Sequence, residues 1–445
     1  MESMNSMFDY ILSHFYSVYS VDQDVKIHYG YTGEHGVLIA KYSGNFFKEK
    51  KPHPQDITWH EWNGKNIPFL FGSDRNDILK VGENTVQIEQ DIIAGAFYFL
   101  SGWQEYHCNN RDHHDRFPYS ESIQKKLNIV TVPVVNYYFD ILKTAIEIAY
   151  NIELKRNYDI GTKTCICLTH DVDHCKSAWK IGGMDAIKKW NFITPWKLLL
   201  MKLFIKDAWF NFDEVLSIEE KFNARSTFFF IPVQGKLDGL PNADYDVNSQ
   251  EIKTIFSNID ARGFEIAIHG SFGTSTNLSQ LSKELKKMPH VYGNRFHFLK
   301  WDTLLSGGVI EKAALRYDST LGFAEHIGFR HSYCFPFRPF DHDKGEAYKF
   351  LEIPLNVMDT TYWLKDYMGL EKSEIPESLR SLFTEVDKFG GCMTLLWHNN
   401  TFSKYKYAGW KEIYIGFLEY CKNNHAVFHT AGDLLTMFSN LLDKD

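Results

Sequence analysis

The chain has 445 residues, of which 44% are hydrophobic and 16% aromatic, and its formal net charge is −8 at pH 7. A chain of this length exceeds one compact core and predicts two or three domains, and its apolar content excludes a disordered chain. The acidic balance, with no long basic run, argues against nucleic-acid binding.

The first twenty residues include Glu2 and Asp9 and lack a continuous apolar core, so a secretory signal is not expected. No run of 18 apolar residues occurs, so no membrane-spanning helix is expected either. The seven cysteines are scattered and odd in number, which is typical of reduced core thiols rather than of a disulfide framework. A cytoplasmic protein is the expectation.

Residues 1–158 are expected to form an N-terminal α/β domain of unknown role. An opening helix is predicted over 8–18, and Asn63-Gly64 predicts the tip of a β-hairpin. Apolar residues at helical spacing follow Asp91. The loop over 107–120 contains several histidines and a cysteine, but their spacing fits no zinc template. No catalytic residue is expected in this domain.

A polar, glycine-containing stretch at 155–163 is the expected boundary, and residues 163–445 are expected to form the second domain. Short apolar strands alternate there with helical segments, which favours a (β/α) barrel or a close relative. The strands are expected at 165–169, 226–232, 264–269, 294–299, 315–320, 350–355, 392–398 and 426–430.

Residues 186–210 stand apart because they are rich in lysine, tryptophan and leucine. One interpretation is an insertion that packs on the rest of the protein. The other is a basic amphipathic surface that makes peripheral contact with anionic lipid or with a lipid-linked substrate.

The segment 164–176 carries the strongest functional signal. An apolar strand ends there in His170, Asp171, Asp173 and His174, whereas a helix cap would require one aspartate only. The carboxyl ends of parallel strands line the crevice of an α/β protein, so an active site is favoured at this position. Further polar residues also lie at or just past predicted strand ends: His269, His297, Asp318 and His398.

Two arginines and one tryptophan are candidate substrate-binding residues. Arg295 and Arg330 could bind a substrate carboxylate or phosphate, or each could pair with Asp318 or another carboxylate inside the barrel. Trp397 could stack on a sugar ring or belong to the core.

Several short motifs follow one another in the second half of the chain: LTHDVDH at 168–174, STFFFIP at 226–232, HGSFG at 269–273, NRFHFL at 294–299, GFR at 328–330, PLNVMD at 354–359 and LLWH at 395–398. In kind and order they resemble motifs of the polysaccharide deacetylase superfamily, carbohydrate esterase family four and its relatives. Residues 163–430 resemble a divergent branch of that superfamily. The resemblance implies a distorted (β/α)7-type barrel, preceded here by a smaller α/β domain similar to an uncharacterised one found ahead of such deacetylases.

The resemblance also implies roles for individual residues. Asp171 corresponds to the catalytic base, Asp173 and His269 to metal ligands, and His398 to the general acid. Gly273 stands where the superfamily has its second ligating histidine. His297 is the candidate replacement, with His170 and His174 as alternatives, and zinc is the expected ion.

The function implied is that of a metal-dependent hydrolase removing an N-acetyl group from an amino sugar or a polysaccharide precursor. Two alternatives stay open. One is a hydrolase of another C–N bond, such as that of a cyclic amide or imide. The other is a metal-free glycan-binding or scaffold protein that has lost catalysis.

Overall fold

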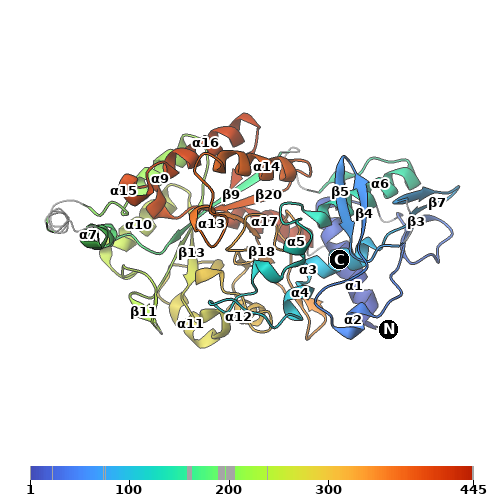
Figure 1. Cartoon of the computed structure of the whole chain (residues 1–445), viewed down its shortest axis with the longest axis horizontal. Coiled ribbons are helices and arrows are strands. Elements are labelled where there is room, and N and C mark those ends of the chain that lie inside the picture. Colours follow the sequence, from blue (N-terminus) through green and yellow to red (C-terminus); the bar gives the residue numbers. More distant parts are fainter. Residues whose placement is uncertain are drawn as a thin grey trace.

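The computed structural model describes residues 2–22, 24–73, 75, 77–157, 163–188, 196, 206–237 and 239–442. Figure 1 shows a smaller N-terminal unit, coloured blue to teal, beside a larger unit coloured green to red.

The N-terminal unit combines a small sheet with three main helices. Its four strands, in spatial order, are β2 (Ile27–Tyr29), β3 (Gly36–Ile39), β7 (Thr85–Ile88) and β6 (Leu79–Val81). The helices are α1 (Glu2–Val18), α3 (Ile92–Leu100) and α6 (Val134–Tyr150). The predicted hairpin is confirmed as β4 (Thr58–Trp62) and β5 (Lys65–Phe69). Its two tip residues, Asn63 and Gly64, have φ angles of 47° and 72°, as a two-residue type I′ turn requires.

The large sheet of the second unit has nine strands among the described residues, and all of its strand pairs are parallel. In spatial order they are β18 (Leu351–Glu352), β15 (Tyr317–Asp318), β14 (Gly293–Phe296), β13 (Glu265–Gly270), β10 (Thr227–Phe230), β9 (Cys165–Val172), β20 (Cys392–Leu396) and β19 (Leu355–Met358), and β21 (Val427–His429) lies along the start of β9.

The two ends of this path, β18 and β19, are separated in the chain by Ile353 and Pro354 alone. The short segment 351–358 therefore supplies both edge strands of the sheet and brings the two edges close together. Counted this way, seven strand positions surround the core, with β21 added beside β9. The expected fold class, a distorted (β/α)7-type barrel preceded by a smaller α/β unit, is confirmed.

Helices follow most of the barrel strands and cover the outside of the sheet (Figure 1). They are α9 (Phe212–Glu220), α10 (Gln250–Ala261), α11 (Leu278–Leu285), α12 (Ser306–Lys312), α14 (Ile375–Asp387), α16 (Trp410–Asn423) and α17 (Ala431–Leu442). Because the strands are parallel, their carboxyl ends meet at one rim of the barrel, and this rim carries the polar side chains discussed below.

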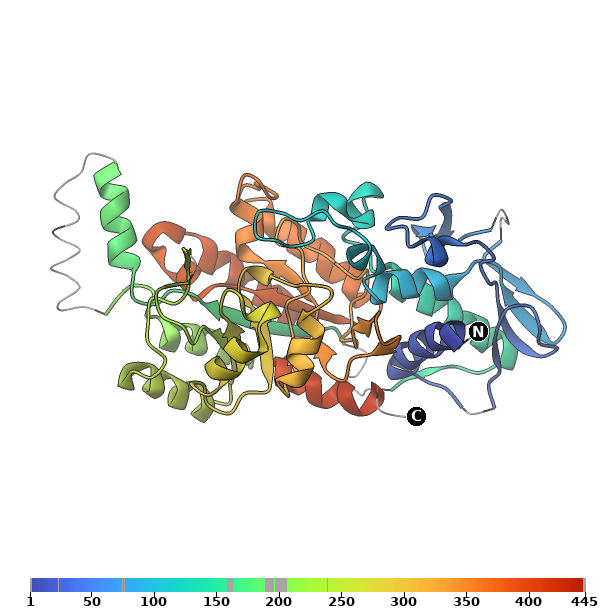
Figure 2. The same cartoon turned by 90° about the horizontal axis from the view of Figure 1, so that it is seen from below.

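The two units share a continuous apolar core. The last helix, α17, leaves the barrel and packs on α1, as Figure 2 shows for the red and blue helices beside the C and N labels. The start of α17 has a capping box: the backbone N–H of Thr430 donates to Asp433, and that of Asp433 donates to the Thr430 hydroxyl (2.9 and 3.1 Å).

Three further expectations concern the chain as a whole. The seven cysteines are unpaired and buried, as expected of core thiols. Within the described ranges, no helix combines the length and the apolar character needed to cross a bilayer. The segment 186–210 is predicted either to pack on the rest of the protein or to contact lipid, and its residues 189–195 and 197–205 lie outside the described residues.

Candidate functional site

The strand β9 delivers its side chains to two different environments, because successive residues of a strand point to opposite faces. Asp171 faces the barrel interior, where its Oδ1 accepts a hydrogen bond from Nη1 of Arg295 (2.8 Å). His170, one residue earlier, is fully buried on the outer face and bonds through both ring nitrogens, to Glu219 and to the Trp397 carbonyl. His170 is therefore not a metal ligand.

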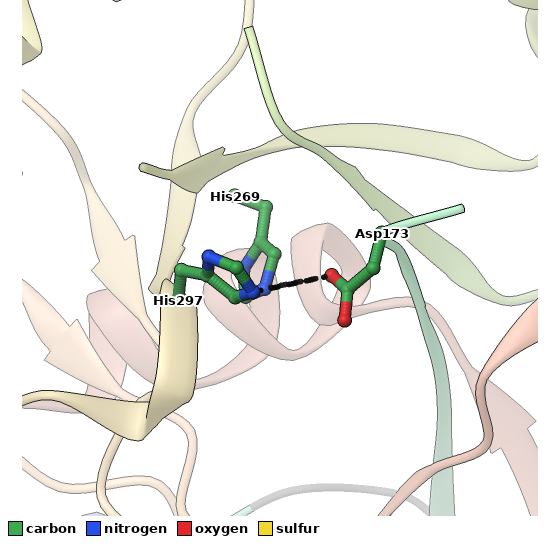
Figure 3. A group of neighbouring side chains, drawn as sticks. All are labelled: Asp173, His269 and His297. Carbon is green, nitrogen blue, oxygen red and sulfur yellow. Dashed lines mark ion pairs between the residues drawn. The ribbon is translucent and has the colours of Figure 1, made fainter. Parts of the chain in front are cut away.

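Three side chains from different strand ends converge on one another (Figure 3), and Asp171 lies beside them. The Asp173 Oδ1 atom lies 3.5 Å from Nε2 of His269 and 3.8 Å from Nε2 of His297. Together the three residues offer ligand atoms that all lie within 4.8 Å of one another. Ligand atoms bound to a tetrahedral Zn²⁺ stand about 3.4 Å apart, so this spacing suits a single ion.

The hydrogen bonds around the cluster also fit a cation. Nδ1 of His269 lies 2.7 Å from the carbonyl oxygen of Arg295, which can only accept, so Nδ1 carries the proton and Nε2 presents a lone pair. This lone pair faces the Asp173 oxygen and, at 3.5 Å, Oδ2 of Asp171. The Asp173 Oδ1 atom is buried and has no hydrogen-bond partner among the described residues. With the His269 ring neutral, a positive ion held by its Nε2 and by Oδ1 of Asp173 would satisfy both of these atoms.

The protonation states support the same conclusion. Burial lowers the pKa of His297 to about 4, against the opposing pull of Asp173, so its imidazole is neutral near pH 7 and can act as a ligand. Burial alone would raise the pKa of Asp173. In acid, where His297 becomes charged, His297 and then His269 and His398 outweigh burial and hold the pKa of this carboxyl well below its usual range, so Asp173 is a carboxylate near pH 7.

His398 follows β20 and lies across from the cluster, with Nε2 3.8 Å from Oδ2 of Asp173. Its other nitrogen, Nδ1, lies 2.7 Å from Oδ1 of Asp359, a fully buried carboxylate at the end of β19. Burial disfavours the imidazolium form, but the charge of Asp359 and its hydrogen bond raise the pKa of His398 to about 10. His398 therefore holds a proton that it can donate.

Asp359 was not expected to have a role of its own, although the motif at 354–359 includes it. It shares the signal of the other site residues, namely a carboxylate directly after a predicted strand. Its Oδ2 accepts bonds from the His398 backbone N–H (2.8 Å) and the Thr401 hydroxyl (3.1 Å), so both the ring and the backbone of His398 are oriented by one side chain.

The expectation that Arg295 binds substrate is wrong. Its side chain is fully buried, and its donors are used by Asp171, by the hydroxyl of Thr169 and by the carbonyl and hydroxyl of Ser319. Its guanidinium also lies over the ring of Phe229. The alternative, pairing with a carboxylate inside the barrel, is what the structure shows. Arg295 holds Asp171 in place.

Two other expected substrate contacts are also wrong. Arg330 lies away from the site and forms a buried bidentate pair with Glu105 of the N-terminal unit (2.7 and 2.5 Å). Trp397 is fully buried against Trp410 and Tyr414, because its side chain points to the outer face of the sheet, and no face is open for a sugar. The remaining alternative ligand, His174, lies beside Asp244 (3.9 Å) and Trp209 rather than within the cluster.

A cavity of about 250 Å³ opens over the cluster, Asp171 and His398. The lining also has an apolar part, in which Leu299, Ala324 and Leu396 belong to one packed cluster; its apolar members are Leu299, Ala324, Met358, Leu364, Tyr367 and Leu396. The wall also includes His114 and Arg116 from the N-terminal unit. The sequence predicted no site residue there, because nothing in the local pattern indicates which surface of the barrel the loop reaches.

A family model described as "Family of unknown function (DUF7033)" matches residues 3–151. The comparison with curated proteins found no match. Among solved structures, the chain is similar to a protein from Mycobacterium smegmatis assigned as a polysaccharide deacetylase, with 17% identity over 64% of this chain and 93% of that one and a TM-score of 0.43.

Two other solved structures are each 11% identical to this chain. One, from Pseudomonas aeruginosa PAO1, is also assigned as a polysaccharide deacetylase and is covered over 97% of its length against 66% of this chain, with a TM-score of 0.45. The other is PuuE allantoinase, covered over 92% of its length against 63% of this chain, with a TM-score of 0.42.

Proposed function

We propose that the protein is a metal-dependent hydrolase that removes an N-acetyl group from an amino sugar or from a polysaccharide precursor. The observation that carries the proposal is the convergence of Asp173, His269 and His297 at one point, with Asp171 and His398 both within 4 Å of that group. One carboxylate and two imidazoles form a ligand set that leaves coordination positions open, as catalytic zinc sites do.

In this proposal Asp173, His269 and His297 hold a divalent ion, with zinc as the expected metal. Such an ion lowers the pKa of a coordinated water from about 15.7 to about 7 and polarises a carbonyl. Asp171 takes the proton of the attacking water, and Arg295 keeps the Asp171 carboxylate pointed at the cavity through its 2.8 Å hydrogen bond.

The departing amine requires a proton, and His398 is placed to supply it. Its Nε2 faces the cavity while Asp359 holds Nδ1, so the proton that reaches the substrate is the one on Nε2. Asp171 and His398 therefore act as base and acid at two different points of the same cavity.

The cavity supports an acetylated substrate of modest size. Its apolar lining, which includes Leu299, Ala324 and Leu396, suits the methyl group of an acetamide, and a cavity of about 250 Å³ has room for a sugar unit. The buried, unpaired cysteines support a reducing compartment, so the cytoplasm is the proposed location.

The test combines metal analysis with acetate release. Purified protein is loaded with Zn²⁺, and its metal content and its release of acetate from N-acetylated amino sugars are measured beside those of Asp173→Ala. A matched control is Asp366→Ala, an exposed aspartate outside the cluster. We expect one bound metal and acetate release from the wild type and the control, and neither from Asp173→Ala.

Each other result has a clear meaning. Stoichiometric metal with turnover of cyclic amides but not of acetylated sugars would replace the deacetylase by another C–N hydrolase. No bound metal under any loading condition would overturn the enzyme proposal in favour of a metal-free glycan-binding protein.

A further inference from the structure

The residues that follow His297 have an unusual backbone. Phe298 and Leu299 have φ angles of 62° and 53°, so two consecutive residues with side chains adopt the left-handed conformation. This conformation is unfavourable for L-residues and persists only where surrounding contacts hold it. Because the turn begins directly after His297, it determines where the His297 ring lies relative to Asp173 and His269.

Several of the contacts that hold this turn come from the N-terminal unit. Nη1 of Arg116 donates a 2.8 Å hydrogen bond to the carbonyl oxygen of Phe298, across 182 positions of sequence. The ring of His114 stacks on the ring of Phe298 (centroids 4.6 Å apart), and Phe298 in turn stacks on His297 (4.1 Å). Asp115 reaches the next part of the turn through an ion pair with Lys300 (3.2 Å).

The loop that makes these contacts is itself held by one carboxylate. Oδ1 of Asp112 accepts the backbone N–H groups of His114 and Arg116, both at 2.9 Å. Oδ2 accepts the side chain of Arg116 at 2.8 Å from Nε and lies 2.7 Å from Nη2. The guanidinium is buried and has its charge neutralised, so it is fixed in direction before it meets the Phe298 carbonyl.

We propose that this loop, residues 112–116, is a positioning element of the metal site and that Arg116 is its principal positioning residue. The N-terminal unit thereby gains a role: it holds His297, a ligand from the barrel, at the distance from Asp173 and His269 that one ion requires. The inference rests on the proposed function for the identity of the three ligands. A lysine could not replace Arg116, because one ammonium group lacks the planar set of donors that joins Asp112 to Phe298.

Metal affinity tests this inference, because it is measured without substrate. Zn²⁺ is titrated by calorimetry into the metal-free full-length wild type and into Arg116→Met, and the absorption spectrum of the Co²⁺-loaded proteins reports the coordination geometry. The control is Arg111→Met, since Arg111 directly precedes this loop, is exposed and, among the described residues, donates to the carbonyls of Cys108 and Asn110.

We expect Arg116→Met to weaken Zn²⁺ binding by about 10- to 100-fold and to alter the Co²⁺ spectrum, as the loss of an outer-shell partner does, while Arg111→Met stays within about twofold of the wild type. If Arg116→Met does not fold, His114→Ala, which removes the stack on Phe298 alone, is expected to weaken binding in the same direction. Unchanged Zn²⁺ affinity in whichever of these variants folds would overturn the inference.

The outcomes separate this inference from the function proposed above. A wild type that binds Zn²⁺ and releases no acetate contradicts the deacetylase but not the positioning role, which is decided by the affinity difference alone. A wild type that is an active deacetylase and an Arg116→Met variant of equal affinity contradict the positioning role but not the deacetylase.

Discussion

Nδ1 of His398 lies 2.7 Å from Oδ1 of Asp359, and no part of the Asp359 side chain is exposed to solvent. The pair resembles an acid–base dyad in which a buried carboxylate selects the tautomer of a histidine and stabilises its protonated form. The carboxylate also binds the backbone of the same histidine, so ring and backbone move together.

Replacing Asp359 with asparagine is therefore expected to impair the acid. Without the negative charge the pKa of His398, which Asp359 raises to about 10, falls, so the basic limb of the pH–kcat profile shifts to lower pH. We expect kcat to drop by about 10²- to 10⁴-fold. The profile is measured by acetate release at saturating Zn²⁺. A reduced kcat with an unmoved basic limb would assign Asp359 a purely structural role.

Asp171→Asn separates the base from the metal ligands. The amide cannot take a proton from water, so acetate release is expected to fall by about 10²- to 10⁴-fold. Metal content is expected to stay stoichiometric, because Asp171 is not one of the three clustered ligands. Elemental analysis and acetate release on one sample check both points. Full activity in this variant would exclude Asp171 as the base.

Arg330→Met tests the correction made for that residue. Removing one partner of a buried pair leaves Glu105 without its counter-charge, and we expect a loss of about 3–5 kcal/mol in the free energy of unfolding. The double variant with Glu105→Gln is expected to recover part of this loss. Urea denaturation measures both. The folded fraction should bind Zn²⁺ like the wild type; a selective loss of substrate affinity would restore Arg330 as a substrate contact.

Stability is expected to fall in mild acid because of His14, which lies where α1 meets the barrel. Its Nδ1 bonds the Tyr10 carbonyl, and its Nε2 accepts the backbone N–H of Arg338, so the neutral ring is the form that fits. Burial lowers the pKa of His14 to about 4. As the pH falls, His14 is therefore protonated in the unfolded chain before it is protonated in the folded protein. The stability that the neutral His14 contributes above pH 6.5 is lost as the pH falls towards 4.

Between pH 7 and pH 5, His14 alone is expected to lower the free energy of unfolding by about 2 kcal/mol. Denaturant unfolding at the two pH values is expected to show a smaller difference for His14→Gln than for the wild type. His425→Gln, which changes an exposed histidine, serves as the control and should keep the wild-type difference. Equal differences in all three proteins would show that His14 is not responsible.

The barrel and most of its site were predictable for a simple reason. Strands buried on both faces are continuously apolar, and the polar residue that ends each one falls at the same rim, so His269, His297 and His398 could be expected to converge. The sequence could not show which group Arg295 contacts, because several carboxylates are expected inside the barrel and a buried arginine could pair with any of them. The face of the sheet to which Trp397 points depends on the register of its strand, and a shift of that register by one residue turns the side chain to the other face.

The contribution of the N-terminal loop lay beyond sequence reasoning for a different reason. Arg116 and Phe298 meet only because two units dock in one orientation, and docking is determined by surfaces assembled from distant segments. Periodicity and capping signals report on neighbours in the chain and carry no information on such a contact.

The packing of α17 on α1 bears on how the protein reaches its final form during synthesis. Helix α1 is made before α17, so it can bury its apolar stripe fully only when the segment at 431–442 has been synthesised. Cutting the chain near residue 158 would therefore expose the apolar stripe of α1 on the N-terminal fragment, and would also separate Glu105 from Arg330. We expect such a piece to aggregate when produced alone.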